Sequence, residues 1–132
     1  MEINELSSRV INAAIAVHRA LGPGLLESVY LRCLVFELQE MGLVVKSEVA
    51  LPISYRGVTI DNSFRLDLLV EDTLIIELKS VEKVLPLHLK QLLTYLKLAK
   101  KPLGLLINFN EELLKNGITR LANNLGLDHQ KT

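Results

Sequence analysis

Two carboxylates and one lysine lie within a segment whose other residues are almost all apolar. Nine residues separate Asp67 from Glu77, and Lys79 follows Glu77 after a single leucine. Like charges placed opposite each other on paired strands are destabilising, and partial burial raises the cost. A divalent cation between the carboxylates would remove this conflict, and Mg²⁺ or Mn²⁺ suits such oxygen ligands. A lysine beside the ion can orient a water molecule or stabilise a negatively charged transition state, which predicts phosphodiester hydrolysis.

A β-hairpin would bring these side chains together. Residues 64–70 and 74–79 are predicted strands joined by a short turn, and counting outward from the turn places Asp67 opposite Glu77. Side chains alternate along a strand, so one face is expected to be apolar and the other charged. The apolar face would hold Leu66, Leu68, Val70, Leu74, Ile76 and Leu78, and the other face Arg65, Asp67, Leu69, Ile75, Glu77 and Lys79.

A salt-bridge lattice would explain the same charged residues without a metal ion. Arg65 and Lys79 would then balance Asp67 and Glu77 across the strands. Both interpretations depend on the register, because a slip of one residue would move the charges to different faces.

The net charge of the chain is zero, but the charges are unevenly distributed. Residues 1–78 carry six Lys or Arg and eleven Asp or Glu, whereas residues 79–101 carry six lysines and one acid, Glu82. A basic stretch beside an acidic centre favours a polyanion such as nucleic acid. The lysines could equally decorate the solvated face of a helix, so charge alone does not decide.

Helices and strands are expected to form one α/β (α+β) domain over residues 1–132. Apolar spacing with start and stop signals predicts helices over about residues 4–21, 25–41, 86–100 and 111–125, and the tail 126–132 is expected to be frayed. Further strands are predicted over residues 43–51, 53–55, 58–60 and 103–109, with Pro52 as a break or an edge and Arg56-Gly57 as a tight turn. The expected core is a central mixed sheet of about four to five strands flanked by helices, with a parallel crossover through the third helix.

Composition also excludes some classes of site. Cys33 is the only cysteine, so neither an intramolecular disulfide nor a cysteine-based zinc site can form. No apolar run is long enough to cross a membrane, and the first residues lack the pattern of a signal peptide. We therefore expect a cytoplasmic protein with no membrane partner.

The pattern around the hairpin resembles the PD-(D/E)xK nuclease superfamily. Asp67 and Glu77-Leu78-Lys79 match its central half-motif, although Leu66 stands where the superfamily name has proline. The superfamily usually adds an acid from an N-terminal helix, and Glu27 is well placed for that position. Residues 24–30, Gly-Leu-Leu-Glu-Ser-Val-Tyr, match the signature of the GxxExxY proteins, a branch of this superfamily.

The resemblance covers about residues 5–124 and implies a restriction-endonuclease-like core. It also implies roles: Asp67 and Glu77 as direct ligands of Mg²⁺ or Mn²⁺, Glu27 as a direct or water-mediated ligand, and Lys79 as the residue that positions the attacking water. Gln91 and Tyr95 resemble the Gln-xxx-Tyr element of the exonuclease-like branch, which implies that Gln91 contacts the site or the nucleic-acid backbone.

Several of these residues also have simpler explanations. Glu27 could merely complement the positive end of a helix. Tyr30 shares a helix face with Glu27 and could either hydrogen-bond in the site or pack in the core. Gln91 and Tyr95 could form a surface polar pair.

The leading hypothesis is a divalent-metal-dependent nuclease acting on DNA or RNA. Lys83, Lys90 and Lys97 would contact backbone phosphates, so binding should weaken with salt. The alternative is a non-catalytic module that keeps the nuclease fold and binds nucleic acid or protein. A third hypothesis is a homodimeric, structure-specific resolvase, because two-fold symmetry suits two cuts. The sequence does not distinguish DNA from RNA, or endonuclease from exonuclease action.

Overall fold

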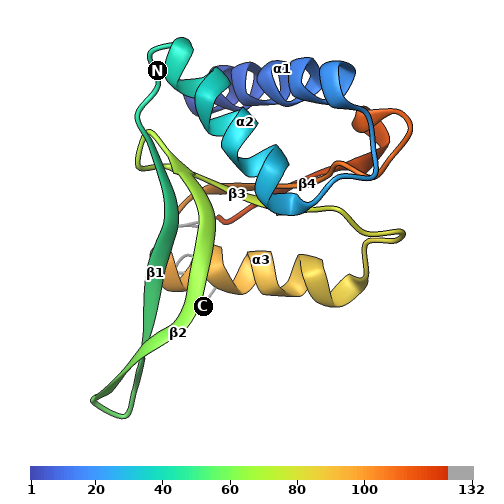
Figure 1. The fold of residues 1–132 in the computed structure, drawn as a ribbon. Coiled ribbons are helices and arrows are strands. Elements are labelled where there is room, and N and C mark those ends of the chain that lie inside the picture. Colours follow the sequence, from blue (N-terminus) through green and yellow to red (C-terminus); the bar gives the residue numbers. More distant parts are fainter. Residues whose placement is uncertain (125–132) are drawn as a thin grey trace.

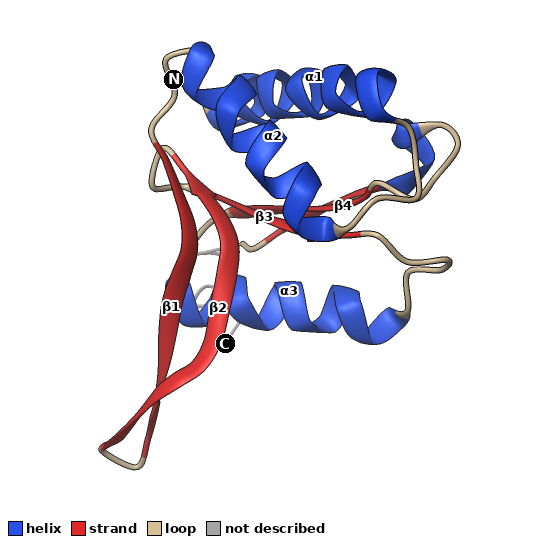
Figure 2. Ribbon diagram, in the orientation of Figure 1, coloured by secondary structure: helices blue, strands red, loops and turns tan. Residues whose placement is uncertain are grey.

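A sheet between two layers of helices forms the body of the protein (Figures 1 and 2). The structure, a computed structural model, describes residues 1–124, except for the side chains of residues 62 and 63. None of the described helices is long and apolar enough to cross a membrane. The elements are α1 (Ile3–Leu21), α2 (Glu27–Glu40), β1 (Val45–Tyr55), β2 (Val58–Val70), β3 (Leu74–Lys79), α3 (Pro86–Ala99), β4 (Leu103–Asn108), the 3₁₀ turn η1 (Leu114–Gly117) and β5 (Ile118–Ala122).

The sheet of the described residues has five strands in the order β1-β2-β3-β4-β5. β3 and β4 are parallel, and the other neighbouring strands are antiparallel. The parallel pair is connected through α3, as the sequence predicts. The expected α/β class, a central mixed sheet flanked by helices, is confirmed.

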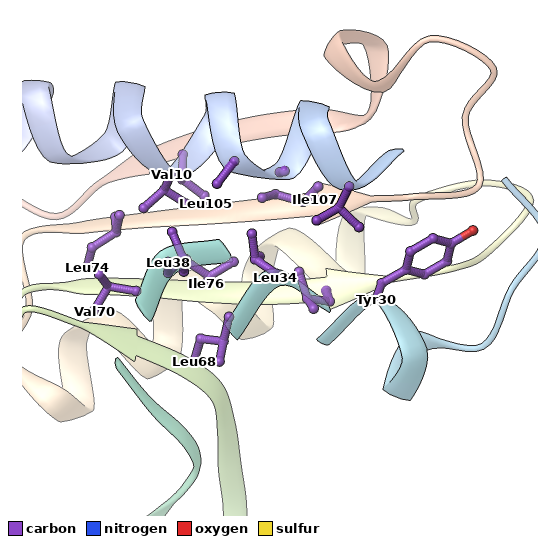
Figure 3. Packing of buried hydrophobic residues seen from close by; sticks show 14 of the residues in the cluster. Val10, Tyr30, Leu34, Leu38, Leu68, Val70, Leu74, Ile76, Leu105 and Ile107 are labelled. Carbon is purple, nitrogen blue, oxygen red and sulfur yellow. The ribbon is translucent and has the colours of Figure 1, made fainter. Parts of the chain in front are cut away.

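Each face of the sheet packs against its own helical layer. On the α1–α2 side, Leu34 and Leu38 of α2 and Val10 of α1 pack against the strands (Figure 3). On the opposite side, Leu92 and Leu96 of α3 pack against the other face. Burial of one such side chain contributes about 1.5–3 kcal/mol, so β2 and β3 are held firmly from both sides.

The first hairpin is longer than predicted. Residues 53–55 and 58–60 are not separate strands but the ends of β1 and β2, which form an arm extending away from the body (Figure 1). Pro52 does not end β1, because β1 lies at the edge of the sheet and the register shifts between Leu51 and Ile53. Arg56 and Gly57, with φ of 50° and 83°, form the predicted tight turn.

The predicted helix over residues 111–125 is wrong for its described part. That segment forms η1 and then β5, which pairs with the edge of β4. A Cβ atom at Gly117 would clash with the backbone oxygen of Asn108, so the absence of a side chain at Gly117 lets η1 pass close to the end of β4. The β-branched Ile118 and Thr119 then favour a strand. Residue 125 and the predicted frayed tail 126–132 lie outside the described residues.

The predicted apolar face of the second hairpin is wrong at one position. Leu66 packs on the α3 side with Leu69, whereas Leu68 packs on the α1–α2 side as predicted. The alternation is interrupted at Asp67, which lies opposite Glu48 of β1, a residue with a left-handed φ of 52°. The carboxylate of Asp67 is therefore not confined to the α3 face of the sheet.

Candidate active site

The backbone ladder between β2 and β3 stops just before Asp67 and Glu77. Three backbone pairs join the strands, starting at Val70 and Leu74 as the turn length predicts. Beyond these pairs, the two carboxylates accept hydrogen bonds from backbone N–H groups of the facing strand. Oε2 of Glu77 accepts a hydrogen bond from the N–H of Asp67 at 2.7 Å, and Oδ2 of Asp67 accepts one from the N–H of Leu78 at 2.8 Å. Each carboxylate has a second oxygen available for a ligand.

This carboxylate pair is costly to ionise. Glu77 is only 8% exposed, and its burial, followed by the negative charge of Asp67, raises its pKa to about 8. Burial also raises the pKa of Asp67, and the hydrogen bond from Leu78 opposes that shift. Near neutral pH the pair therefore holds less negative charge than two free carboxylates, and a bound cation would stabilise the ionised form.

The salt-bridge lattice considered as an alternative does not form among the described residues. Within residues 1–124, the one ion pair closer than 4 Å joins Lys101 to Asp72, and neither acid of the carboxylate pair takes part in it. Arg65 is exposed, and Asp67 and Glu77 are bound by backbone N–H groups instead. Within residues 1–124, neither Asp67 nor Glu77 therefore forms an ion pair with a basic side chain.

Glu27 lies beside the carboxylate pair at the start of α2. It is exposed and lines a cavity of about 180 Å³. Its negative charge contributes to the raised pKa values of both Asp67 and Glu77, which places it within electrostatic range of both. The cavity is lined by Glu27, Ser28, Leu31, Glu48, Asp67 and Leu78.

Two hydroxyl groups fix the loop that leads into α2 and Glu27. The buried Tyr30 donates a hydrogen bond to the carbonyl of Gly22 at 2.5 Å and accepts one from the N–H of Leu25 at 3.1 Å. Ser80, directly after β3, donates to the carbonyl of Leu25 at 2.6 Å. Tyr30 is thus used to hold the loop, and Ser80 ties that loop to the end of the strand that carries Glu77 and Lys79.

Lys79 is the last residue of β3, two residues after Glu77. It is half-buried, and its positive charge lowers the pKa values of Asp67 and Glu77, against the larger effect of burial. The next segment is fixed by the buried Asn108, whose side chain binds both the N–H and the carbonyl of Val81, at 3.1 and 2.9 Å. This bracing holds the backbone after Lys79 against β4.

The comparison with protein families decides the wider assignment. Residues 4–121 match the model of the PD-(D/E)XK nuclease superfamily. The chain belongs to this superfamily. Its mixed sheet with helices on both faces is consistent with the restriction-endonuclease-like fold. Membership indicates nuclease activity in general and a nucleic-acid substrate. Comparison with curated proteins and with solved structures found no match to the chain.

PD-(D/E)XK nucleases typically use divalent metal ions, and the donor set here fits one in part. The free oxygens of Asp67 and Glu77 are hard ligands of the kind that such an ion prefers, and they come from two neighbouring strands. No three Asp, Glu, His or Cys residues within the described part of the chain are grouped closely enough to hold a metal. Magnesium commonly uses one or two carboxylates and completes its shell with water and phosphate, so a pair of carboxylates is compatible with this mode of binding.

Helix α3 of this PD-(D/E)XK chain carries Tyr95 toward the carboxylate pair. Tyr95 packs against Phe64, with ring centroids 5.3 Å apart. Burial and then the charges of Glu77 and Asp67 raise the pKa of its phenol, so the ring lies on the side of the carboxylate pair. Gln91, one turn earlier and half-buried, shares this side of the helix.

The three lysines predicted to bind nucleic acid are exposed but are not grouped on the Gln91–Tyr95 side. Lys83 lies in the loop before α3, close in sequence to Lys79. Lys90 and Lys97 project from α3 about 140° and 160° away from Tyr95 around the helix axis, at 3.6 residues per turn. Lys83 is thus the one of the three that lies in the loop following the strand of Glu77 and Lys79.

Glu48 is a candidate site residue that the sequence analysis missed. It lines the cavity with Glu27 and Asp67, and its charge contributes to the raised pKa of Asp67. The pairs Ser47–Leu68 and Val49–Leu66 flank it, so it lies opposite Asp67. The sequence shows Glu48 as an acid within a predicted strand. Its position opposite Asp67 was not predicted, because it depends on the register shift at Pro52.

Proposed function

We propose that this protein is a divalent-metal-dependent nuclease that hydrolyses phosphodiester bonds in DNA or RNA. The observation that carries the proposal is the interlocked carboxylate pair, in which Asp67 and Glu77 are fixed by backbone N–H groups and have no basic partner within residues 1–124. A buried pair of this kind is destabilising without a ligand, and divalent cations are the ligands suited to it. The Gly24–Tyr30 segment supports the GxxExxY branch as the finer assignment.

The proposed roles follow from the placement of each residue. The free oxygens of Asp67 and Glu77 would hold Mg²⁺ or Mn²⁺, and Glu27 would hold it through water because it is exposed across the cavity. When bound, the ion supplies charge neutralisation at the phosphate and a lowered pKa for water. Lys79 orients the attacking water and offsets negative charge in the transition state.

The nucleic-acid backbone would pass over the C-terminal end of β3, which carries Lys79. Gln91 and Tyr95 would contact it from α3, and Lys83 would contact a phosphate from the adjoining loop. Lys90 and Lys97 point elsewhere, so they would contact only flanking phosphates.

A cleavage assay with a lysine variant tests the proposal. Purified wild-type protein is incubated with plasmid DNA, single-stranded DNA and RNA, with Mn²⁺ or with a chelator. Cleavage is expected with metal only, and Lys79→Ala is expected to lower the rate about a hundredfold. Lys115→Ala changes an exposed lysine in η1 and serves as the matched control. Equal rates in all three proteins would reject Lys79 as a catalytic residue.

The second candidate is a binding module with the nuclease fold. The raised pKa of Glu77 and the absence of a third gathered ligand among residues 1–124 are the observations that favour it. It predicts nucleic-acid binding without metal-dependent cleavage of any of the three substrates. That outcome would replace the enzyme proposal.

Ser80 is expected to support cleavage as a positioning residue. Ser80→Ala removes the hydrogen bond to Leu25 that ties the Glu27 loop to β3, so the rate should fall several-fold with little change in substrate binding. Ser80→Thr retains the hydroxyl and should recover most of the rate. Ser54→Ala, an exposed serine in the arm, is the control. A loss that Thr does not recover would contradict the positioning role.

A further inference from the structure

Helix α2, together with Leu26 just before it, carries an apolar stripe on a side that does not face the sheet and that partly borders α1. Leu26, Val29 and Phe36 are 73%, 37% and 61% exposed, and Cys33 is half-buried between them. Their spacing of three, four and three residues is that of the core positions of a coiled coil. Leu34 and Leu38, which face the sheet, lie on the other side of the helix.

The stripe borders a groove of about 380 Å³ between α1 and α2. Alanine side chains at positions 16 and 20 of α1 form part of its wall and leave it open beside Phe36. Arg32 and Glu37 supply the charges of its lining. The lining consists of Ala16, Val17, Ala20, Leu21, Arg32, Cys33, Phe36 and Glu37, none of which is a proposed site residue.

Arg32 and Glu37 make this surface complementary to itself. Relative to the apolar stripe they lie on opposite flanks of α2, five residues apart, with Arg32 first in sequence. In a parallel helix pair this is the spacing at which a flanking residue of one helix meets the flanking residue of the other. A two-fold axis along the helices would therefore place each Arg32 beside the partner's Glu37, twice per dimer.

We propose that the apolar stripe of α2 binds the same stripe of a second copy of this chain in a parallel arrangement. The exposed Phe36 side chains would be buried in the contact, and two Arg32–Glu37 pairs would set its orientation. A ligand that lacks either an acidic group for Arg32 or a basic group for Glu37 would leave one of these residues without an opposite charge. The dimer proposal does not rest on the nuclease proposal. None of its residues is a proposed site residue, and its test measures the mass of the protein in solution rather than cleavage.

Reciprocal charge changes test this contact in the full-length protein. Sedimentation velocity is expected to show the wild-type chain, 14.8 kDa, associating to twice that mass as its concentration rises. Arg32→Glu alone or Glu37→Arg alone places like charges together twice and should raise the dimer dissociation constant about tenfold. The double variant Arg32→Glu/Glu37→Arg should return to the wild-type value, since the pairs are merely reversed.

Mixing the two single variants gives the decisive outcome. In the mixed dimer both contacts again join opposite charges, so dimers should reappear when equal amounts are combined. A variant that had failed to fold could not be rescued in this way. Phe36→Ser should weaken association, and Lys115→Glu should not. A wild-type protein that is monomeric at every concentration, or single variants that neither weaken nor rescue, would overturn the proposal.

Discussion

Glu77→Gln is expected to lower the rate of metal-dependent cleavage strongly and to raise the thermal stability of the protein above neutral pH. The amide oxygen can still accept the hydrogen bond from the N–H of Asp67, so the end of the hairpin should stay intact. The buried negative charge is removed, and with it the repulsion by Asp67 that contributes to the raised pKa. Loss of one of two metal-binding carboxylates should lower the cleavage rate about a thousandfold.

Both effects can be measured on the same preparation. Melting is followed by circular dichroism at about pH 8, where the carboxyl group of Glu77 in the wild-type protein is about half ionised, and cleavage is followed with Mn²⁺ present. Glu82→Gln replaces an exposed acid in the loop before α3 and should change neither quantity. A fully active Glu77→Gln protein would exclude Glu77 as a ligand. A less stable one would contradict the cost assigned to its charge.

The metal-free protein is expected to lose stability as the pH rises from about 4.5 to 8. The folded state raises the pKa of Glu77 from 4.5 to about 8, mainly through burial, so it retains a proton that the unfolded chain has already lost in this window. The unfolded state then binds fewer protons, and the free energy of unfolding falls with pH. Each pH unit well inside this window lowers the free energy of unfolding by about 1.4 kcal/mol. Because titration is gradual near both pKa values, the total loss from pH 4.5 to 8 is about 4 kcal/mol. The raised pKa of Asp67 acts in the same direction.

Urea denaturation in the presence of a chelator, repeated across this pH range, measures the effect. Adding Mg²⁺ or Mn²⁺ at the alkaline end should restore much of the lost stability, because the ion binds the ionised carboxylates of the folded state only. The Glu77→Gln protein provides the control and should show a much flatter pH dependence. Stability that rises with pH through the same window would disprove the assignment.

The hairpin that carries Asp67 and Glu77 was predictable because its turn is short. Once Val70 faces Leu74, every later pair follows by counting, and the structure has this register. What counting could not predict is the end of the ladder, where the carboxylates bind backbone N–H groups of the facing strand. Sequence patterns assume continuous pairing, whereas the available oxygens at this site arise where pairing stops.

Other features escaped prediction because they depend on contacts that are distant in sequence. Counting inward from the Arg56-Gly57 turn places Glu48 opposite Arg65, but the register shift at Pro52 moves it opposite Asp67. The segment after Phe109 has helical apolar spacing, and tertiary pairing with β4 overrides it. The roles of Ser80 and Asn108 also depend on backbone groups brought near by the fold.

The register shift at Pro52 divides the β1–β2 hairpin into two independent parts. On one side, the pairs that flank Glu48 are fixed by the body of the sheet, and on the other the arm pairs by its own count from the Arg56-Gly57 turn. The arm could therefore be shortened or lengthened by matched pairs of residues without rotating Glu48 away from Asp67. This makes the arm a suitable insertion point, where a foreign recognition segment could be grafted while the carboxylate pair keeps its geometry.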